Sequence, residues 1–286
     1  MSLMSISCGR CLTVALGVAL SASACARTPP TEQEGAPAAT EISRTINGHT
    51  YTDAPVEVKL GPNTLGIPAN YLDSQIAPWP GEGVSLVIEW PDMKPTAPGA
   101  RANPRTNDFR KEIRVLVSYV DRVPIGSVLE RLSSNEAITE EDWLERRNPA
   151  DRLDLRVAQP ERLGLTPYAI NESLMDHYAR AYEAKYGRPH PRNPAFEDDW
   201  YISRGPDGTL SSFIKCDSPK HSGDGLEIRG NDIIDAPGGT IAGCTHYIVD
   251  IENSLSISLN YNRVFLRDWR AMEQAIRDVL NGTKVR

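Results

Sequence analysis

The sequence lacks the short motifs that mark the common enzyme classes. It contains no G-x-S-x-G elbow, no H-E-x-x-H zinc helix, no G-x-x-x-x-G-K-[ST] phosphate loop and no dinucleotide-binding glycine pattern. Basic residues are also fewer than acidic ones. The chain has 31 lysines and arginines and 38 acidic residues, which gives a net charge of −7. Since nucleic acid is bound by basic surfaces, this balance disfavours a nucleic-acid ligand. We therefore predict no cofactor, no bound metal and no catalytic residue.

The apolar run near the amino end, residues 11–20, is too short to span a bilayer as a stable helix. It follows Arg10 and precedes the small residues Ala22, Ser23 and Ala24, which is the pattern of a secretory signal peptide. We predict that residues 1–24 are this signal. The mature chain then loses Arg10 and has a charge of −7 − 1 = −8. Export would also place the chain where thiols are oxidised.

Cysteine is scarce, with five in the chain, and two of these leave with the signal peptide. Cys216 ends one predicted strand and Cys244 begins the next, so a disulfide between them would tie two hairpins together. By the loop-entropy model, closing about 28 residues contributes roughly 3.5 kcal/mol. A zinc site is the alternative, because His221 and His246 lie near the two cysteines. The spacing matches no common zinc pattern, so we favour the disulfide.

The remaining cysteine, Cys25, ends the sequence Ala22-Ser23-Ala24-Cys25. This stretch resembles the lipobox of bacterial lipoproteins, in which the cysteine becomes a lipid-carrying amino terminus, although Ala replaces the usual Leu three residues before it. Ordinary cleavage after Ala24 is the alternative and would leave a free thiol. The odd cysteine favours lipidation of Cys25. With Ala26 next, the resemblance implies anchoring to the outer membrane from the periplasm.

The segment after Cys25 is poor in large apolar residues up to about Arg44. It cannot bury enough surface to fold, so we predict a lipidated end and a disordered tether over residues 25–45. The prolines of residues 91–107 predict a long irregular loop. The other elements expected in this half are four strands and one short helix, at residues 56–60, 64–67, 84–90, 113–119 and 127–133.

The middle of the chain is predicted to be mainly helical. Thr139 followed by acidic residues is typical of a helix start, so a short helix is expected over residues 139–144. A strand is expected around residues 153–157. Apolar residues at helical spacing predict a helix over residues 171–186, which Gly187 would end.

The clearest strand and helix patterns of the sequence lie between residues 199 and 280. Residues 199–204 and 209–216 flank Gly-Pro-Asp-Gly and predict a hairpin. A second hairpin is predicted at residues 245–251 and 255–261. Its expected register pairs Ile251 with Leu255 and Val249 with Ile257, since the alternative register would put His246 inside the core.

A closing amphipathic helix is indicated by apolar residues at three- and four-residue spacing, followed by Gly282. Those apolar residues are Leu266, Trp269, Met272, Ile276, Val279 and Leu280. The whole pattern predicts an α+β protein of antiparallel sheets built from hairpins with accessory helices. We expect two lobes, an N-terminal one at residues 46–135 and a C-terminal one at residues 136–286 that holds the disulfide.

Three stretches carry a looser resemblance. They are Ile67-Pro68-Ala69-Asn70-Tyr71-Leu72, Trp90-Pro91-Asp92-Met93-Lys94-Pro95, and the region from Cys216 through Cys244-Thr245-His246 to Leu266-Arg267-Asp268-Trp269. They resemble patterns in periplasmic immunity lipoproteins that are encoded beside secreted antibacterial toxins. The resemblance implies a non-enzymatic protein that binds a toxin.

Under that hypothesis, exposed loops at residues 94–107 and 220–243 would contact the partner. The candidate contact residues are Lys94, Arg101, Arg105, His221, Asp224 and Asp232. Two other classes stay open. One is an envelope hydrolase that uses carboxylates such as Asp198 or Asp199, and the other is a structural envelope lipoprotein that binds cell-wall polymer.

Overall fold

The structure is a computed structural model that describes residues 42–285, apart from residues 80, 82, 137–139, 141 and 239. The predicted signal peptide, the lipidation of Cys25 and most of the predicted tether lie outside the described residues. The first strand, β1 (Ser43–Ile46), begins within the last residues assigned to that tether.

An eight-stranded antiparallel sheet forms the centre of the fold, in the order β5-β6-β14-β13-β10-β9-β8-β7. The strands are β5 (Gly83–Glu89), β6 (Glu112–Tyr119), β7 (Val157–Ala158), β8 (Thr166–Ala169), β9 (Asp198–Arg204), β10 (Leu210–Asp217), β13 (Gly243–Asp250) and β14 (Leu255–Asn262). β6 pairs with β14, so segments from both sides of residue 136 share one sheet. Residues 41–286 form one compact unit.

Three two-stranded hairpins surround this sheet. β1 pairs with β2 (His49–Thr52), and β3 (Pro55–Leu60) pairs with β4 (Asn63–Pro68), as the sequence predicted for the second of these. The third hairpin, β11 (Leu226–Arg229) with β12 (Asp232–Asp235), interrupts the loop between the two cysteines. Gly230 sits at its turn with a φ of 63°, a value that glycine adopts without steric cost.

Three α-helices complete the structure in the described residues: α1 (Val128–Ser134), α2 (Glu172–Tyr186) and α3 (Trp269–Gly282). The limits of α2 follow from its capping residues. The side chain of Asn171 accepts a hydrogen bond from the Leu174 amide at one end, and Gly187 takes a left-handed conformation at the other. No helix in this part of the chain has the length and apolar character needed to cross a membrane.

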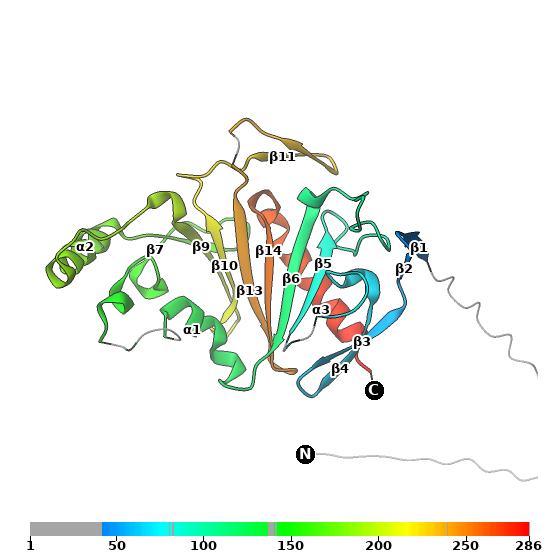
Figure 1. Cartoon of the computed structure of the whole chain (residues 1–286). Helices are drawn as coiled ribbons and strands as arrows, with labels where there is room; N and C mark the ends of the chain where they lie inside the picture. Colours follow the sequence, from blue (N-terminus) through cyan, green and yellow to red (C-terminus); the bar gives the residue numbers. More distant parts are fainter. Residues whose placement is uncertain are drawn as a thin grey trace, which may run out of the picture. The chain divides into compact units, whose positions relative to one another are not determined.

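One face of the sheet, here called the back face, is covered by α3, and Figure 1 shows α3 passing behind the central strands. Phe265, Met272 and Ile276 are fully buried there. They belong to the main core together with sheet residues that include Val115, Ile214, Ile248, Ile257 and Leu259. The predicted amphipathic helix is therefore confirmed, and its apolar side does bury on the sheet.

Cys216 and Cys244 are joined in a disulfide, which confirms the predicted bridge. They lie directly opposite one another on β10 and β13, with Cα atoms 4.0 Å apart. Both side chains are buried in the main core. The bridge therefore joins the hairpin β9–β10 to the hairpin β13–β14 at the back face.

The predicted register of β13 against β14 is wrong by one residue. Asp250 pairs with Leu255 and His246 with Leu259, so His246 faces the core and is fully buried. Its Nε2 lies 2.8 Å from Oε1 of Glu273 on α3, and this partner offsets the cost of burying a polar ring. The prediction assumed that only one face of the hairpin is covered, whereas Tyr247 on the other face packs against a second cluster.

That second cluster lies on the opposite face of the sheet, here called the front face. Leu129 of α1 packs against Ile202, Phe213 and Tyr247. α1 covers only part of the front face, near the turn between β9 and β10, since Leu210 at the start of β10 also joins the cluster. Much of the rest of the front face is open, and Arg114, Leu116 and Asn260 are exposed there.

Two predicted elements in the middle of the chain need correction. The expected helix over residues 139–144 is instead a 3₁₀ helix at Leu144–Arg147, preceded by Trp143, and Thr139 lies outside the described residues. The expected strand over residues 153–157 begins as a 3₁₀ helix at Leu153–Leu155, and only its last residue enters β7. The 3₁₀ turn places Leu153 against the cluster below α1, a tertiary contact that local sequence does not show.

Candidate functional site

The open part of the front face carries a row of polar side chains that crosses four strands. Lys215 pairs with Thr245, Thr245 with Asn260, and Asn260 with Arg114, so all four point to the same side. We call these four residues the basic row. The Thr245 hydroxyl donates a hydrogen bond to Oδ1 of Asn260 over 3.0 Å, which fixes the middle of the row.

A second row lies two residues further along each strand, at one end of the sheet. It contains four carboxylates, and its members are Asp198, Asp217, Gly243, Asn262, Glu112 and Glu89. We call this set the acidic row. Gly243 has no side chain, so the row has a gap at β13. Oδ2 of Asp217 accepts the Gly243 amide over 2.7 Å at the side of this gap.

A cavity of about 560 Å³ lies over these two rows. Its rim includes two apolar side chains that are largely exposed, Phe109 at 62% and Ile241 at 48%. An open cavity lined by convergent polar and charged groups is a candidate for contact with another molecule.

Lys215 is held on the side of the cavity that faces away from the acidic row. Its Nζ lies 4.8 Å from the centre of the Trp200 ring and 5.3 Å from that of Phe213, which is a cation–π arrangement. Among the described residues, no carboxylate oxygen forms an ion pair with it. Burial lowers the pKa of Lys215, and the charge of Asp198 opposes that shift.

The carboxylate of Asp198 is half-buried and is not hydrogen-bonded to a described residue. Burial raises the pKa of Asp198, Lys215 lowers it, and Asp217 raises it further. The nearby guanidinium of Arg156 donates to the main-chain oxygen of Asp198 over 2.8 Å and stacks 4.0 Å over Trp200. Burial lowers the pKa of Arg156 to about 10.

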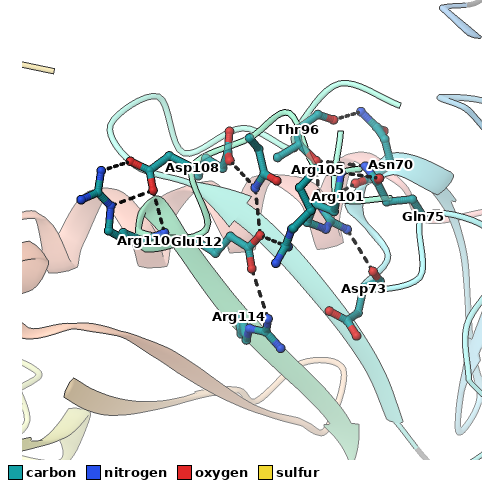
Figure 2. A network of polar contacts seen from close by, with 12 residues as sticks. Asn70, Asp73, Gln75, Thr96, Arg101, Arg105, Asp108, Arg110, Glu112 and Arg114 are labelled. Carbon is teal, nitrogen blue, oxygen red and sulfur yellow. Dashed lines mark hydrogen bonds and ion pairs between the residues drawn. The ribbon is translucent and has the colours of Figure 1, made fainter. Parts of the chain in front are cut away.

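At the other end of the acidic row, Glu112 is enclosed by donors (Figure 2). It accepts hydrogen bonds from Arg105, from Asn107 over 2.8 Å and from Arg114 over 3.2 Å. Asn107 also donates to Glu89 over 2.9 Å, while burial raises the pKa of Glu89. The carboxylates of β5 and β6 are therefore used within the chain.

The loop between β5 and β6 is irregular, as predicted, but it is fixed by internal contacts (Figure 2). Arg101 donates to Oγ1 of Thr96 over 2.8 Å and to the main-chain oxygens of Asn70 and Leu72. Burial lowers the pKa of Arg101 to about 10. The predicted contact residue Arg101 thus has its partners within the chain, at Thr96 in this loop and at residues 70–72 before β5. Arg105 is bound to Glu112, whereas Lys94 is exposed.

The two loops predicted to contact a partner meet at this end of the sheet. Arg110 donates to Oδ1 of Asp235 over 2.8 Å and to the main-chain oxygen of Ile233 over 3.0 Å. Lys111 donates to the main-chain oxygen of Asn231 over 2.6 Å, and its Nζ lies 3.7 Å from Asp232. The sequence analysis missed Arg110 and Lys111, because nothing local shows that residues more than a hundred positions apart are neighbours.

The other predicted contact residues lie at the base of the β11–β12 hairpin. Oδ1 of Asp224 accepts a hydrogen bond from Nε of Arg263 over 2.6 Å, and His221 is exposed. Arg263 also donates to the main-chain oxygens of Asp217 and Ser222, so one buried guanidinium holds the start of this loop. The third predicted contact residue of this loop, Asp232, lies elsewhere and forms an ion pair with Lys111 of the β5–β6 loop.

The two aspartates considered for a hydrolase face opposite sides of the sheet. Asp198 is on the front face, and Asp199 is the next residue in the same strand. Oδ1 of Asp199 accepts a hydrogen bond from Ser218 over 3.1 Å. The two side chains therefore lie on opposite faces of the sheet.

Comparison with known proteins gives one clear relative. No protein-family model matches the chain, and no curated protein matches it. Among solved structures, the immunity protein Smlt3025 of the Stenotrophomonas maltophilia type IV secretion system is 67% identical in sequence. The match covers 87% of this chain and 100% of that one, with a TM-score of 0.83. The chain therefore belongs to the same family as this type IV secretion system immunity protein.

Proposed function

We propose that this chain is an immunity protein that binds and neutralises a toxic protein delivered by a type IV secretion system. The observation that carries this proposal is the 67% identity over the full length of an immunity protein. The front face adds physical support, because its cavity is open to solvent and is bordered by the exposed side chains of Phe109 and Ile241, which a partner can contact directly.

The contact surface we propose is the end of the sheet where the β5–β6 loop and the β11–β12 hairpin meet. It includes the open front face and the predicted contact residues Lys94, Arg105, His221, Asp224 and Asp232. Lys94 and Asp232 are exposed and can reach a partner directly, while Asp224 and Arg105 position the two loops. A large antiparallel sheet below them keeps the two loops at a fixed spacing.

The proposed place of action is the periplasm. The signal sequence would export the chain, and lipid on Cys25 would hold it at the outer membrane. The stretch from Cys25 to β1 is about 17 residues, and a flexible linker of that length has a mean end-to-end distance of about 23 Å. The folded unit would thus stand close to the membrane that an incoming toxin has just crossed.

A protection assay tests the function. The secreted protein encoded beside this chain's gene is directed to the periplasm of a sensitive bacterium, with and without the chain. We expect growth only when the exported chain is present. The matched control lacks residues 1–24 and stays in the cytoplasm. Cell death with the exported chain present, at expression equal to that of the toxin, would reject the proposal.

Lipidation is tested separately. We expect the mature protein to carry a mass increase for a diacylglyceryl and acyl group at Cys25 and to sediment with outer membranes. Cys25→Ala should remove that mass and release the chain into the soluble periplasmic fraction. An unmodified Cys25 thiol in the wild-type protein would show that ordinary cleavage occurs instead.

A further inference from the structure

The charged side chains that line the front-face cavity differ in whether a described residue compensates their charge. The three cations each have partners: Arg110 binds Asp108 and Asp235, Arg114 binds Glu112, and the ammonium of Lys215 lies over two aromatic rings. Glu112 accepts from three donors. By contrast, Asp198 and Asp217 form no ion pair with any residue that the structure describes, and the one donor to the Asp217 carboxylate among these residues is the Gly243 amide.

The position of Lys215 explains this imbalance. It precedes Asp217 by two residues on β10, and Phe213 precedes it by two more, so all three point to the front face. The Lys215 ammonium is within 5.3 Å of the Phe213 ring centre and therefore leans away from the acidic row. The charge of Lys215 lowers the pKa of Asp198, but its ammonium lies over aromatic rings and forms no ion pair with either aspartate.

The gap at Gly243 gives access to the two aspartates. Asp217 lies beside Gly243, and Asp198 lies on the next strand beyond Asp217. The cavity continues from this gap to the exposed apolar side chains of Phe109 and Ile241. A long side chain with an aliphatic stem and a charged head has this distribution of apolar and polar groups.

We propose that this cavity receives a lysine or arginine side chain of the secreted partner, with its cationic head beside Asp198 and Asp217 and apolar neighbours against Phe109 and Ile241. The proposal rests on the function proposed above and specifies the contact that carries it. An acidic side chain fits less well, because the cations in the cavity already have partners. The mature charge of −8 also draws a basic partner toward this protein.

The raised pKa of Asp198 is consistent with this role. Burial raises its pKa, which is expected of a carboxylate whose charge has too little compensation in the free protein. An incoming cation supplies that compensation. The contact would then resemble the desolvated charge pairs that give interfaces much of their specificity.

The test measures affinity for the secreted protein encoded beside this chain's gene, by calorimetry with the mature chain. The variant is the double substitution Asp198→Asn and Asp217→Asn, which keeps the side-chain shapes. The amide oxygen of Asn at position 217 can still accept the Gly243 amide. We expect a loss of affinity of about tenfold or more and a weaker dependence on salt between about 50 and about 300 mM NaCl.

The matched control is Glu252→Gln. Glu252 is an exposed carboxylate in the turn between β13 and β14, at the opposite end of the sheet. The control substitution removes one negative charge, as each aspartate substitution does. We expect the affinity to stay within about twofold of the wild type, because exposed charges far from the contact contribute little. Each single variant, Asp198→Asn and Asp217→Asn, is measured as well, with circular dichroism to show that it is folded.

The outcomes separate this inference from the function on which it rests. If the wild-type chain does not bind the neighbouring protein, the proposed function fails and this contact fails with it. If the wild type binds and the folded double variant binds equally well, only the contact is overturned. Tighter binding by the double variant, together with loss of binding in Lys215→Met, would show that an acidic side chain occupies the cavity and would also overturn it.

Discussion

The two faces of the central sheet have different tasks, although they are made from the same strands. On the back face, α3 excludes water from side chains such as Ile248 and Ile257, and the one buried histidine there has a carboxylate partner. On the front face, α1 covers one part only, and the remaining part presents charged and polar side chains around a cavity. Alternate residues of one strand thus pack in the core on one side and, on the other, form the surface proposed to bind a partner.

The largest difference between the faces is expected for two phenylalanines. Phe265 is fully buried at the back face and stacks on Trp90, with ring centres 5.2 Å apart. Phe265→Ala should lower the free energy of unfolding by about 3 to 5 kcal/mol, because it leaves a cavity in a packed core. Phe109→Ala at the front-face rim should change it by less than about 0.5 kcal/mol. Urea unfolding measures the free energy of unfolding of both variants. An equal decrease in the two would contradict the proposed difference between the back and front faces.

The disulfide should have the next largest effect. The double substitution Cys216→Ala and Cys244→Ala should lower the free energy of unfolding by about 2 to 4 kcal/mol, since it removes a crosslink that restricts the unfolded chain. Chemical denaturation with and without reductant measures this loss. The wild type should become less stable in reductant, whereas the double variant should not respond. A response of the variant would mean that reductant acts elsewhere in the chain.

The buried pair of His246 and Glu273 should contribute less. Glu273→Ala removes the partner of a fully buried imidazole nitrogen and of the Ser212 hydroxyl. We expect a loss of about 1 to 3 kcal/mol, which is the cost of leaving a buried polar group unsatisfied. Gln274→Ala, the next residue on α3 and exposed, is the control and should be nearly neutral. Thermal melting of both variants distinguishes them.

The smallest effects concern two aspartates with opposite pH behaviour, Asp108 in the β5–β6 loop and Asp198 on the front face. Hydrogen bonds from Arg110 lower the pKa of Asp108, so its contribution to stability is present above the ordinary aspartate pKa of about 3.9 and is lost as pH falls. Burial raises the pKa of Asp198, so its contribution is present below about 3.9 and is lost as pH rises through the raised value.

Replacing each aspartate should therefore change opposite sides of the stability profile. Asp108→Asn should reduce the loss of stability in acid, and Asp198→Asn should reduce the decline that follows as pH rises above about 4. Urea midpoints between about pH 3 and about pH 7 measure both slopes. If the two variants shift the profile in the same direction, the assigned environments of these carboxylates are wrong.

Much of the local structure could be predicted from the sequence. The hairpin β9–β10 follows from its Gly-Pro-Asp-Gly turn, α2 from Asn171 and Gly187, and α3 from its apolar spacing. These signals are local, because a turn residue or a cap acts on its own neighbours. The disulfide was also predictable, since Cys216 and Cys244 fall at the ends of adjacent strands.

The register of β13 was not predictable by the same reasoning. A one-residue shift exchanges the two faces of a strand, and the decision depended on whether His246 or Tyr247 belongs in the main core. The deciding group is Glu273, which approaches from a helix at the end of the chain. Local alternation cannot show a partner that arrives from a distant element.

The candidate site was predicted in part. The two loops were expected to contact a partner, and the structure brings them together through Arg110 and Lys111. The open row of Lys215, Thr245, Asn260 and Arg114 was not foreseen, because it requires the order of four strands. Loop composition indicated irregular structure and exposure, but it did not indicate which sheet face lies between the loops.

The sequence by itself determined the hairpins β3–β4 and β9–β10, the caps of α2, the cysteine pair and the excess of negative charge, because each depends on neighbouring residues or on composition. Only the tertiary structure decided that β6 lies beside β14, that His246 is buried, and that Asp198 and Asp217 lie beside a glycine gap without an ion pair to any described residue. Strand order and face depend on contacts between distant segments. Their free energy is shared across the whole core, so no single stretch of the chain encodes them.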